Sequence, residues 1–514
     1  MSADVDSSEK RHISHWRSMP QTQTTQRSLS ASLVRLARFR AMSDDRPVRI
    51  ERDVLGDIEV PTDVRYGAQT ARATGLVNPS GRQLRDYPEL VYALVHIKRA
   101  AAVTHSRLGV LSKAIAAAIV ATCDEVLNGQ HRLDLIVDVM SGGGGTAFHM
   151  NVNEVIAHRA SEIADESVHA NTHVNMGQST NDVVPSAMKL ATHRLLTDVA
   201  GALEPLIAST DAVASATADI VKVARTCLQD AVPMTLGQGF GAHRTALKRM
   251  RAELIVIAGE ALTIPIGATA VGTGLGAVSG YRRQVVKELR SATGLDIRSD
   301  DDLFDGLANT DIHVRVSGAL KMLALTVSKQ AKDIRLMSSG PRAGLAEISI
   351  APTQSGSSIM PGKVNPALPE MMIMVGHRAV ANDLATTLAM SDGELDLNVW
   401  EPTVITALFE TCRLLATTLP VYATECVATI RANTESCRRM ADESLALAVV
   451  ISTMFGYDEG ARVALHASST GSTIRDAAIE LELLDAATAD RVLDPLLLTD
   501  PNLSGALLDE LLRH

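Results

Sequence analysis

The segment from Gly356 to Pro366, GSSIMPGKVNP, carries the residue types most suited to chemistry. Glycines and prolines interrupt it too often for a helix, and its polar side chains do not suit a buried strand. Lys363 supplies a positive charge for a carboxylate, beside the hydroxyls of Ser357 and Ser358 and the amide of Asn365. Ser357 can act as a base only where that charge and backbone donors offset its high intrinsic pKa. Composition alone fits a mobile surface loop equally well.

Two more polar segments stand where the helical pattern stops. Ser141 to Asn153 carries four glycines before Thr146, which permits close approach of the backbone to a ligand. A glycine run is more often a flexible turn, and no Gly-Lys-Ser or Gly-Lys-Thr sequence follows to make a phosphate-binding loop. Arg225 to Pro233, which contains Thr226, is by itself only a loop.

A further polar segment, HVNMGQSTND, leads into a long helical pattern and ends at Asp182. Ser179, Thr180, Asn181 and Asp182 are all residue types that cap helix N-termini. A helix start with several uncapped N–H donors also binds anions, so a structural role and a binding role are compatible here.

The overall composition excludes several classes of protein. Hydrophobic residues make up 46% of the 514 residues and aromatic residues only 3%, which favours packed helices over a β-sandwich or barrel. The formal charge is −10, and the sequence has no long blocks of one sign. It therefore does not predict a basic surface that would bind nucleic acid or an anionic membrane. The longest uncharged run, Ala261 to Val278, is broken by a proline and four glycines, so we expect no membrane span there.

The five cysteines are scattered along the chain. They form no CxxC pair and no Cys/His pattern, so we predict neither a disulfide framework nor a bound metal. This distribution is typical of a reducing compartment, and the predicted localisation is therefore cytoplasmic.

Long helical patterns dominate the middle of the chain and predict a mainly α fold with an elongated central helix bundle. At ~1.5 Å rise per residue, each helix would be roughly 30–40 Å long. Shorter helices are expected after Asp86, which we predict as a cap, and over Lys113 to Leu127, whereas Arg49 to Arg72 is expected to be irregular or partly extended. The long patterns cover Asp182–Leu206, Leu236–Leu262, Thr310–Met337, Leu368–Met390 and Pro402–Ile430.

The chain divides into four predicted parts. Residues 1–45 are rich in Ser, Gln and Arg, and we expect a disordered extension or a true start at Met42. Residues 46–180 would form an N-terminal domain and 181–435 the central long-helix bundle. Residues 436–514, where the helical segments shorten, would form a small C-terminal helical domain.

GSSIMPGKVNP resembles the signature loop of the aspartase/fumarase superfamily. The similarity covers nearly all of residues 47–514 in blocks that keep their order, among them HVNMGQSTND, LQDAVPMTLGQ, GATAVGTGL and LNVWEP. The first of these is more similar to the aspartase pattern than to that of class II fumarases. The resemblance implies a homotetramer with a shared helical core, active sites each built from three subunits, and no cofactor. It also implies reversible anti-elimination of ammonia from L-aspartate, or a related amino dicarboxylate, to give fumarate.

The same resemblance implies roles for individual residues. Ser357 would be the base that removes the proton next to the distal carboxylate, which then gains charge as an aci-dianion. Lys363 and Asn365 would hold the other carboxylate of the small dicarboxylate substrate, and Glu370 matches a supporting position. The positions that face the amino leaving group are Asn181 and Thr226. Hydrogen bonds to the aci-dianion would come from Thr146, Ser179, Thr180 and Ser358.

Two departures from the family pattern lie at the predicted site. Cys227 replaces the His of an Arg-Thr-His sequence, and an inert buried thiol is favoured over a nucleophile. After Thr146, where aspartases usually carry Ser and Asn, this chain has Ala147, Phe148 and His149. We hypothesise that His149 restores, from another chain, the imidazole lost at Cys227. A buried polar group without a partner costs ~1–3 kcal/mol, so both changes bear on the choice of substrate.

Three functions remain open at this point. The first is an aspartase-like carbon–nitrogen lyase. The second is a lyase of the same chemistry with another leaving group, either water, as in fumarase, or a substituted amine. The third is a non-catalytic homologue with a structural or binding role, against which the retention of Ser357, Lys363 and Asn365 argues.

Overall fold

The computed structural model describes residues 46–76 and 78–511, and the predicted N-terminal extension, residues 1–45, lies outside these ranges. Within them the chain is mainly helical, and its strands form four sheets of two strands each. The predicted fold class, mainly α with an elongated bundle, is confirmed.

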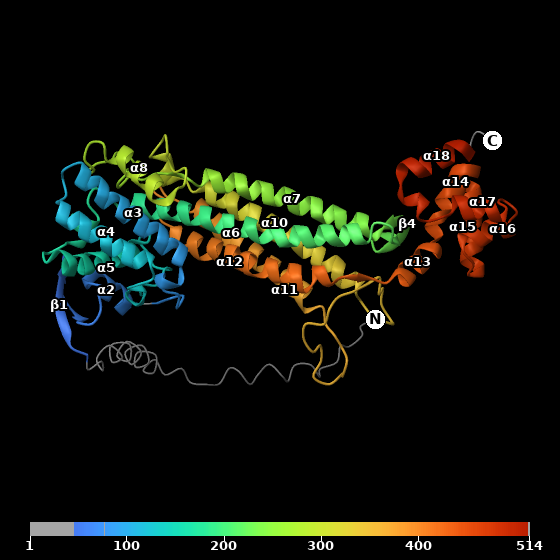
Figure 1. Cartoon of the computed structure of the whole chain (residues 1–514), viewed down its shortest axis with the longest axis horizontal. Helices are drawn as coiled ribbons and strands as arrows, with labels where there is room; N and C mark the ends of the chain where they lie inside the picture. The colour runs from blue at the N-terminus through green and yellow to red at the C-terminus, as the bar shows by residue number, and fades with distance from the viewer. Residues whose placement is uncertain (1–45, 77, 512–514) are drawn as a thin grey trace, which may run out of the picture.

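Five long helices run side by side along the longest axis of the molecule (Figure 1). They are α6 (Thr180–Ala216), α7 (Leu236–Glu260), α10 (Asp311–Met337), α11 (Ala367–Ser391) and α12 (Glu401–Glu425). Helix α6 packs against α7 and α12, and α10 packs against α7 and α11. The facing sides carry fully buried side chains such as Leu247, Leu323 and Phe409. All five long helices predicted from the sequence are present.

Helix α6 is longer than predicted. It continues to Ala216, beyond the predicted end at Leu206, because Leu203, Leu206 and Val213 keep one face buried on both sides of Pro205. Its 37 residues correspond to a rod ~55 Å long. Residues that precede α6 and residues that follow it therefore lie at opposite ends of the bundle.

Helix α12 ends before the predicted Ile430. Cys426 leaves the helical conformation, with φ −122° and ψ −68°, and the 3-10 turn Val427–Thr429 follows. By length and composition, Glu401–Thr429 is apolar enough to cross a membrane, yet half of its most apolar window is buried inside the chain, where α12 contacts α6 and α11. Its apolar character is thus accounted for by packing in the bundle.

The N-terminal part of the chain covers one end of the bundle (Figure 1). Its elements are the hairpin β1 (Val48–Asp53) and β2 (Gly56–Pro61), α2 (Ala68–Leu76), α3 (Pro88–Arg107), α4 (Lys113–Leu127), α5 (Thr146–Ala164) and the π-helical turn Ala170–Val174, joined later in the chain by α8 (Tyr281–Thr293). The prediction that Asp86 caps a helix was wrong. Tyr87 holds the N-cap position of α3, because Asp86 belongs to the 3-10 turn Leu84–Asp86 and accepts the N–H of Gln83 at 2.9 Å.

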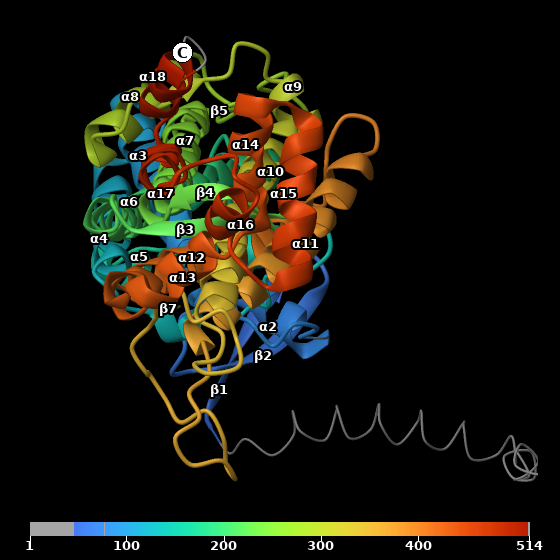
Figure 2. The same cartoon turned by 90° about the vertical axis from the view of Figure 1, so that its right-hand side faces the viewer.

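Shorter helices form the C-terminal part at the other end of the bundle (Figures 1 and 2). They are α13 (Thr434–Asp442), α14 (Ala448–Phe455), α15 (Tyr457–Thr470), α16 (Ile474–Glu480), α17 (Ala486–Val492) and α18 (Pro501–Leu511). Ile451, Val463 and Ala478 belong to a hydrophobic cluster separate from that of the bundle. The shortening of the helices after Asn433 is as predicted, while the domain boundaries at 180/181 and 435/436 stay a prediction.

Short elements connect the long helices. They comprise the antiparallel pair β3 (Val221–Thr226) and β4 (Gln229–Thr235), the parallel pair β5 (Thr263–Ile264) and β6 (Arg298–Ser299), α9 (Asp305–Ala308), and the antiparallel pair β7 (Ile348–Ser349) and β8 (Arg431–Ala432). The β3–β4 hairpin joins α6 to α7, and β7 precedes the signature loop. The predicted site residues thus lie in the first turns of helices, in the β3–β4 hairpin and in the signature loop.

Candidate active site

The glycine-rich segment forms a left-handed turn from which α5 begins at Thr146. Gly143, Gly144 and Gly145 have φ values of 75°, 59° and 80°, a region that side chains rarely adopt. A Cβ atom on Gly145 would lie 2.4 Å from the ring of Phe148, so that only glycine fits there. Thr146 is exposed, and its hydroxyl donates to the carbonyl of Gly143 at 2.8 Å. Rotation of this hydroxyl would turn its proton toward a ligand.

Ser179 and Asn181 are held by capping contacts at the start of α6. The Ser179 hydroxyl oxygen accepts the N–H of Asn181 at 3.2 Å, and the Asp182 carboxylate accepts the N–H of Ser179 at 2.9 Å. The side-chain amide of Asn181 donates to the carbonyl of Ala270 at 2.8 Å. These bonds fix two predicted site residues against a neighbouring loop, as the capping residues in the sequence predict.

Asp182 connects the start of α6 to the same loop, which contains Ala270, through hydrogen bonds. Its buried carboxylate accepts the N–H groups of Gly267 at 2.9 Å and Thr269 at 3.0 Å. Burial raises the pKa of Asp182 to about 6 in spite of these donors. The start of α6 is therefore fixed to residues far along the chain.

Lys98 lies beneath the segment that leads into α6. Its fully buried ammonium group donates to Asn175 Oδ1 at 2.8 Å and to Gln178 Oε1 at 3.0 Å. Burial lowers the pKa of Lys98 to about 7. Sequence reasoning missed this residue, although a single lysine among apolar helix positions was a usable signal.

His149 contacts a predicted site residue within its own chain. Its ring is fully buried, and Nδ1 lies 2.9 Å from the hydroxyl oxygen of Thr180. Burial, and to a smaller extent the charge of Lys98, lowers the pKa of His149 well below its usual value. This enclosure argues against the hypothesis that His149 reaches another chain to replace the imidazole missing at Cys227. We call Thr146, His149 and residues 179–181 the polar end.

Thr226 and Cys227 lie at the far end of α6, on the β3–β4 hairpin. Cys227 and Leu228 form its two-residue turn with φ values of 55° and 62°. Thr226 and Cys227 are exposed, so the expectation of a buried thiol was wrong. A two-residue turn leaves its central side chains at the tip of the hairpin, where nothing in the described part of the chain covers Cys227.

The signature loop, Gly356 to Pro366, places Ser357 where backbone N–H groups point at its hydroxyl. Ser357 Oγ accepts the N–H of Ile359 at 3.2 Å and that of Met360 at 3.0 Å. Gly356 must be glycine, because a Cβ atom would lie 2.6 Å from the carbonyl oxygen of Lys363. Two N–H donors on one hydroxyl oxygen stabilise its anionic form.

The other predicted residues of the loop are Ser358, Lys363 and Asn365, and Glu370 follows it. Ser358 and Lys363 are exposed, and the Asn365 amide donates to the carbonyl of Gly356 at 2.9 Å. Glu370, on the first turn of α11, lies 3.3 Å from the guanidinium group of Arg335. The loop thus presents a cation and hydroxyl groups at the surface.

The structure brings together the residues of the polar end but not all the predicted site residues. The polar end lies where α5 and α6 begin, whereas the hairpin and the signature loop lie toward the other end of the bundle (Figure 1). Arg225 on β3 and Glu347 beside β7 are joined by an ion pair of 2.7 Å, which links the hairpin to the segment before the loop. One chain therefore holds the candidate site as separated parts.

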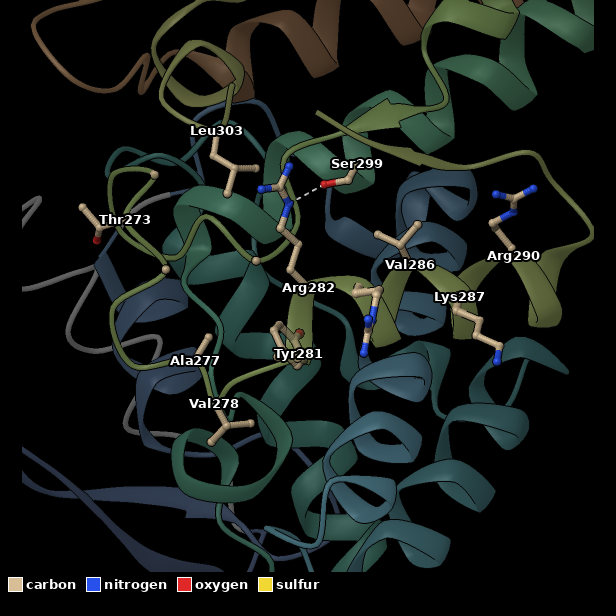
Figure 3. A pocket seen from close by; sticks show the side chains of 15 residues that line it. Thr273, Ala277, Val278, Tyr281, Arg282, Val286, Lys287, Arg290, Ser299 and Leu303 are labelled. Carbon is tan, nitrogen blue, oxygen red and sulfur yellow. Dashed lines mark hydrogen bonds between the residues drawn. The ribbon is translucent and has the colours of Figure 1, made fainter. Parts of the chain in front are cut away.

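Two cavities lie near the polar end. One of about 1140 Å³ is lined by Thr146 and Ala147 and by the π-helical turn. The other, of about 880 Å³, lies against the loop that holds Asn181, and its lining includes basic side chains of α8 (Figure 3). It contains none of the predicted site residues, and there Arg282 donates to Ser299 Oγ at 2.6 Å. In residues 46–76 and 78–511 no group of three or more His, Cys, Asp or Glu residues could hold a metal ion.

Two known families match this chain. Residues 56–381 match a family described as lyase, and residues 447–500 match the fumarase C C-terminus family. The chain belongs to the aspartase/fumarase superfamily. The match covers the polar end, the hairpin and the signature loop, so all the predicted site residues lie within it.

Relatives within the superfamily cover most of the chain. It is 40% identical to the aspartate ammonia-lyase of Pseudomonas aeruginosa over 88% of this chain and 97% of that protein. The aspartate ammonia-lyase of Bacillus subtilis is 38% identical over 91% and 100% of the two chains. Among solved structures, the cobalt-bound fumarate lyase:delta crystallin of Brucella melitensis has a TM-score of 0.86 at 40% identity, covering 88% and 100% of the two chains. The class II fumarase of Schistosoma mansoni has a TM-score of 0.85 at 35% identity, with the same coverage.

Proposed function

We propose that this chain catalyses the reversible anti-elimination of ammonia from L-aspartate, or a related amino dicarboxylate, to give fumarate. The observation that carries the proposal is the signature loop, in which Ser357 Oγ accepts two backbone N–H groups. The similarity to aspartate ammonia-lyases along 88% of the chain supports the choice of ammonia as the leaving group. The reaction as proposed uses no cofactor.

Ser357 acts as the base in this mechanism. Its alkoxide takes a proton from the carbon next to the distal carboxylate. The N–H groups of Ile359 and Met360 stabilise the alkoxide, together with the charge of Lys363, six residues further along the loop. The electron pair left on that carbon passes first into the carboxylate, as an aci-dianion, and then forms the double bond. The carbon–nitrogen bond breaks and the amine departs with its electron pair as ammonia.

Hydrogen bonds to the two carboxylates control the barrier. Donors to the distal carboxylate strengthen as its charge grows, so they stabilise the transition state more than the substrate. Lys363 and Asn365 bind the carboxylate whose charge does not change. One N–H of the Asn181 side-chain amide donates to Ala270 and fixes the amide. Its oxygen, an acceptor, is the atom suited to the substrate ammonium, together with Thr226. The proposed donors to the distal carboxylate are Thr146, Ser179, Thr180 and Ser358.

We further propose a homotetramer in which each active site draws on three subunits. The separation of the polar end, the hairpin and the loop in one chain supports this, as do exposed apolar side chains on the bundle. Met374 on α11 is 62% exposed and Leu384 is 60% exposed. Large apolar side chains gathered on one face are unusual on a surface that stays in contact with water. Others on α7, α10 and α11 are Ile255, Val256, Met322, Leu325, Val380 and Leu388. Light scattering should give a mass about four times that of the chain.

The physiological setting follows as part of the same proposal. An aspartase without disulfides belongs to amino-acid metabolism in the cytoplasm, and all five cysteines are free thiols. Fractionation of the native host with an activity assay would test the location.

A second candidate function is a fumarase-type hydratase, or a lyase for a substituted aspartate. Cys227 favours it, because the family's imidazole would lie close to the leaving group and a thiol changes what that position can bind. The similarity of the fold to that of a class II fumarase, with a TM-score of 0.85, also supports this second candidate.

The direct test incubates the purified protein with L-aspartate, with malate, and with fumarate plus ammonia, and follows the ultraviolet absorbance of fumarate. Turnover of aspartate but not malate is expected. Turnover of malate alone would replace the first proposal by the second. Turnover of none of the three, with the tetramer intact, would contradict both and leave the non-catalytic alternative or an untested amine.

A further inference from the structure

A histidine is enclosed directly behind a proposed substrate-binding hydroxyl. His149 Nδ1 lies 2.9 Å from Thr180 Oγ1, and its other ring nitrogen, Nε2, lies 3.4 Å from the side-chain nitrogen of Asn153. All of this lies within one chain, since α5 carries both His149 and Asn153 and α6 begins with Thr180. The ring therefore bridges α5 to the first residue of α6.

The ring is neutral, so only one of its nitrogens carries a proton. Burial and the neighbouring Lys98 both lower the pKa of His149 well below the usual value. The ionisable groups beneath the polar end are Lys98, whose ammonium donates to Asn175 and Gln178, and Asp182, whose carboxylate accepts backbone N–H groups. Neither makes a hydrogen bond to the ring in the described part of the chain, so the proton position depends on Asn153 and Thr180.

The position of that proton decides what Thr180 can do. With the proton on Nε2, Nδ1 would accept the Thr180 O–H, and that hydroxyl would have no proton left for a substrate. With the proton on Nδ1, the ring donates to Thr180 Oγ1, and the hydroxyl proton is free to point elsewhere. The Asn153 side-chain nitrogen, which donates to Met150 Sδ at 3.3 Å, faces Nε2 at 3.4 Å. The second arrangement makes Nε2 an acceptor for this N–H group, whereas the first would set two N–H groups against each other.

We propose that His149 is a positioning residue that donates its Nδ1 proton to Thr180, so that the Thr180 hydroxyl donates its own proton to the distal carboxylate of the substrate. This inference rests on the proposed function, because it assumes that Thr180 binds the carboxylate that becomes the aci-dianion. It assigns His149 a role in its own subunit, distinct from replacing the imidazole missing at Cys227. It also gives a role to a fully buried polar ring.

Three substitutions of His149 distinguish the loss of its hydrogen-bond donor from the loss of its volume. The amide nitrogen of an asparagine can occupy nearly the place of Nδ1 and donate from there, whereas the longer glutamine places its amide nearer Nε2. Leucine fills space without donating. If His149 positions the Thr180 proton, His149→Asn retains most of the turnover, while His149→Gln and His149→Leu lose roughly 10- to 100-fold in kcat with KM changed less, because the bond strengthens in the transition state.

A double-mutant cycle with Thr180→Val tests the link itself. The double variant His149→Leu/Thr180→Val should be no slower than Thr180→Val alone, because the histidine acts only through that hydroxyl. The inference would be overturned if the losses of turnover in the two single variants multiplied in the double variant. It would also be overturned if His149→Asn were as impaired as His149→Leu. Melting temperatures measured for every variant show whether a loss of turnover merely follows a loss of folding.

A binding measurement keeps this inference separable from the proposed function. Calorimetry with 3-nitropropionate, whose nitronate has the charge and shape of an aci-carboxylate, should show about 10-fold weaker binding to His149→Leu than to wild type and little change for His149→Asn. Fumarate binding should change less. A protein that turns over aspartate but binds the nitronate equally well in all variants keeps its function and loses this inference. If the protein does not turn over aspartate but binds the nitronate in the predicted pattern, the role of His149 is supported and the proposed function is contradicted.

Discussion

The polar end and the signature loop carry complementary parts of one proposed site, yet they are held in different ways. At the polar end, Thr180 is backed by a buried imidazole and Asn181 is bonded to a loop far along the chain. In the described part of the chain, every hydrogen bond of residues 355–365 is to another residue between 355 and 367. The polar end is therefore preorganised within one subunit, whereas the loop keeps its internal shape but lacks fixed contacts with its surroundings.

This difference predicts two kinds of variant. Changes in the loop should reduce turnover and leave the melting temperature unchanged, because the bundle does not depend on the loop for its packing. Changes beneath the polar end should alter stability as well, because the groups there are buried and bonded to several elements. The three substitutions below test this contrast from the largest expected effect to the smallest.

Ser357→Ala should have the largest effect. Loss of the base removes roughly 10²- to 10⁴-fold of catalysis, while assembly and melting temperature stay those of the wild type. The assay is steady-state formation of fumarate from aspartate, with light scattering on the same sample. Ser358→Ala, the matched control one residue along, should lose less, because Ser358 is proposed only as a donor. Equal losses in the two variants would remove Ser357 as the base.

Gly356→Ala should follow. The new Cβ atom would lie 2.6 Å from Lys363 O and 2.8 Å from Asn365 N, so the loop must change shape at the residues proposed to bind a carboxylate. We expect about a 10-fold loss in kcat/KM, since misplaced groups give up orientation, and a melting temperature within ~1 °C. Gly75→Ala, where a Cβ atom meets nothing within 4 Å, is the control. A large fall in melting temperature would show that the loop is part of the folded core.

Glu401→Gln should alter stability with pH rather than turnover. Glu401 begins α12, and its carboxylate oxygen Oε2, for which the described chain offers no hydrogen-bond partner, lies 3.8 Å from where a Cβ on Gly144 would sit. Burial raises the pKa of Glu401 to about 8, from an ordinary value of 4.5. Between these two pH values, Glu401 keeps its proton in the folded protein and has lost it in the unfolded chain. The contribution of Glu401 to the free energy of unfolding is therefore complete below pH 4.5 and falls as pH rises through about 8.

The glutamine variant cannot ionise and should lose this part of the pH dependence. Its melting temperature should exceed that of the wild type by a few degrees at about pH 9 and match it more closely at pH 5. Scanning calorimetry across this range is the measurement. Parallel curves for the two proteins would show that Glu401 does not titrate with folding.

Much of the fold could be predicted from the sequence because the long helices carry their own signals. Apolar periodicity and loop composition located all five, and Ser179 marked the start of α6 through its capping chemistry. The end of α6 was predicted ten residues early, at Leu206, whereas packing of one face on both sides of Pro205 sustains the helix to Ala216. Asp86 was misassigned because a capping residue type also suits a short turn.

The site residues were predicted through resemblance more than through pattern. Exposure of Cys227 depends on a two-residue hairpin turn, and burial of His149 depends on the packing of α5 against α6; no local spacing encodes either. The polar end also has buried charged neighbours, namely Lys98, Asp182 and Glu401. For Lys98 alone, a charged residue in an apolar helical pattern was an available signal in the sequence.

The central claim is that the polar end of one subunit and the signature loop of another form one active site for the elimination. Its most direct test mixes two strongly impaired variants, Thr180→Val and Ser357→Ala, by co-expression or by refolding together, and measures aspartate turnover. Random assembly of tetramers should give about a quarter of the sites one intact part of each kind, and so roughly a quarter of wild-type activity, far above that of either variant alone. A mixed tetramer no more active than its parents would contradict the account.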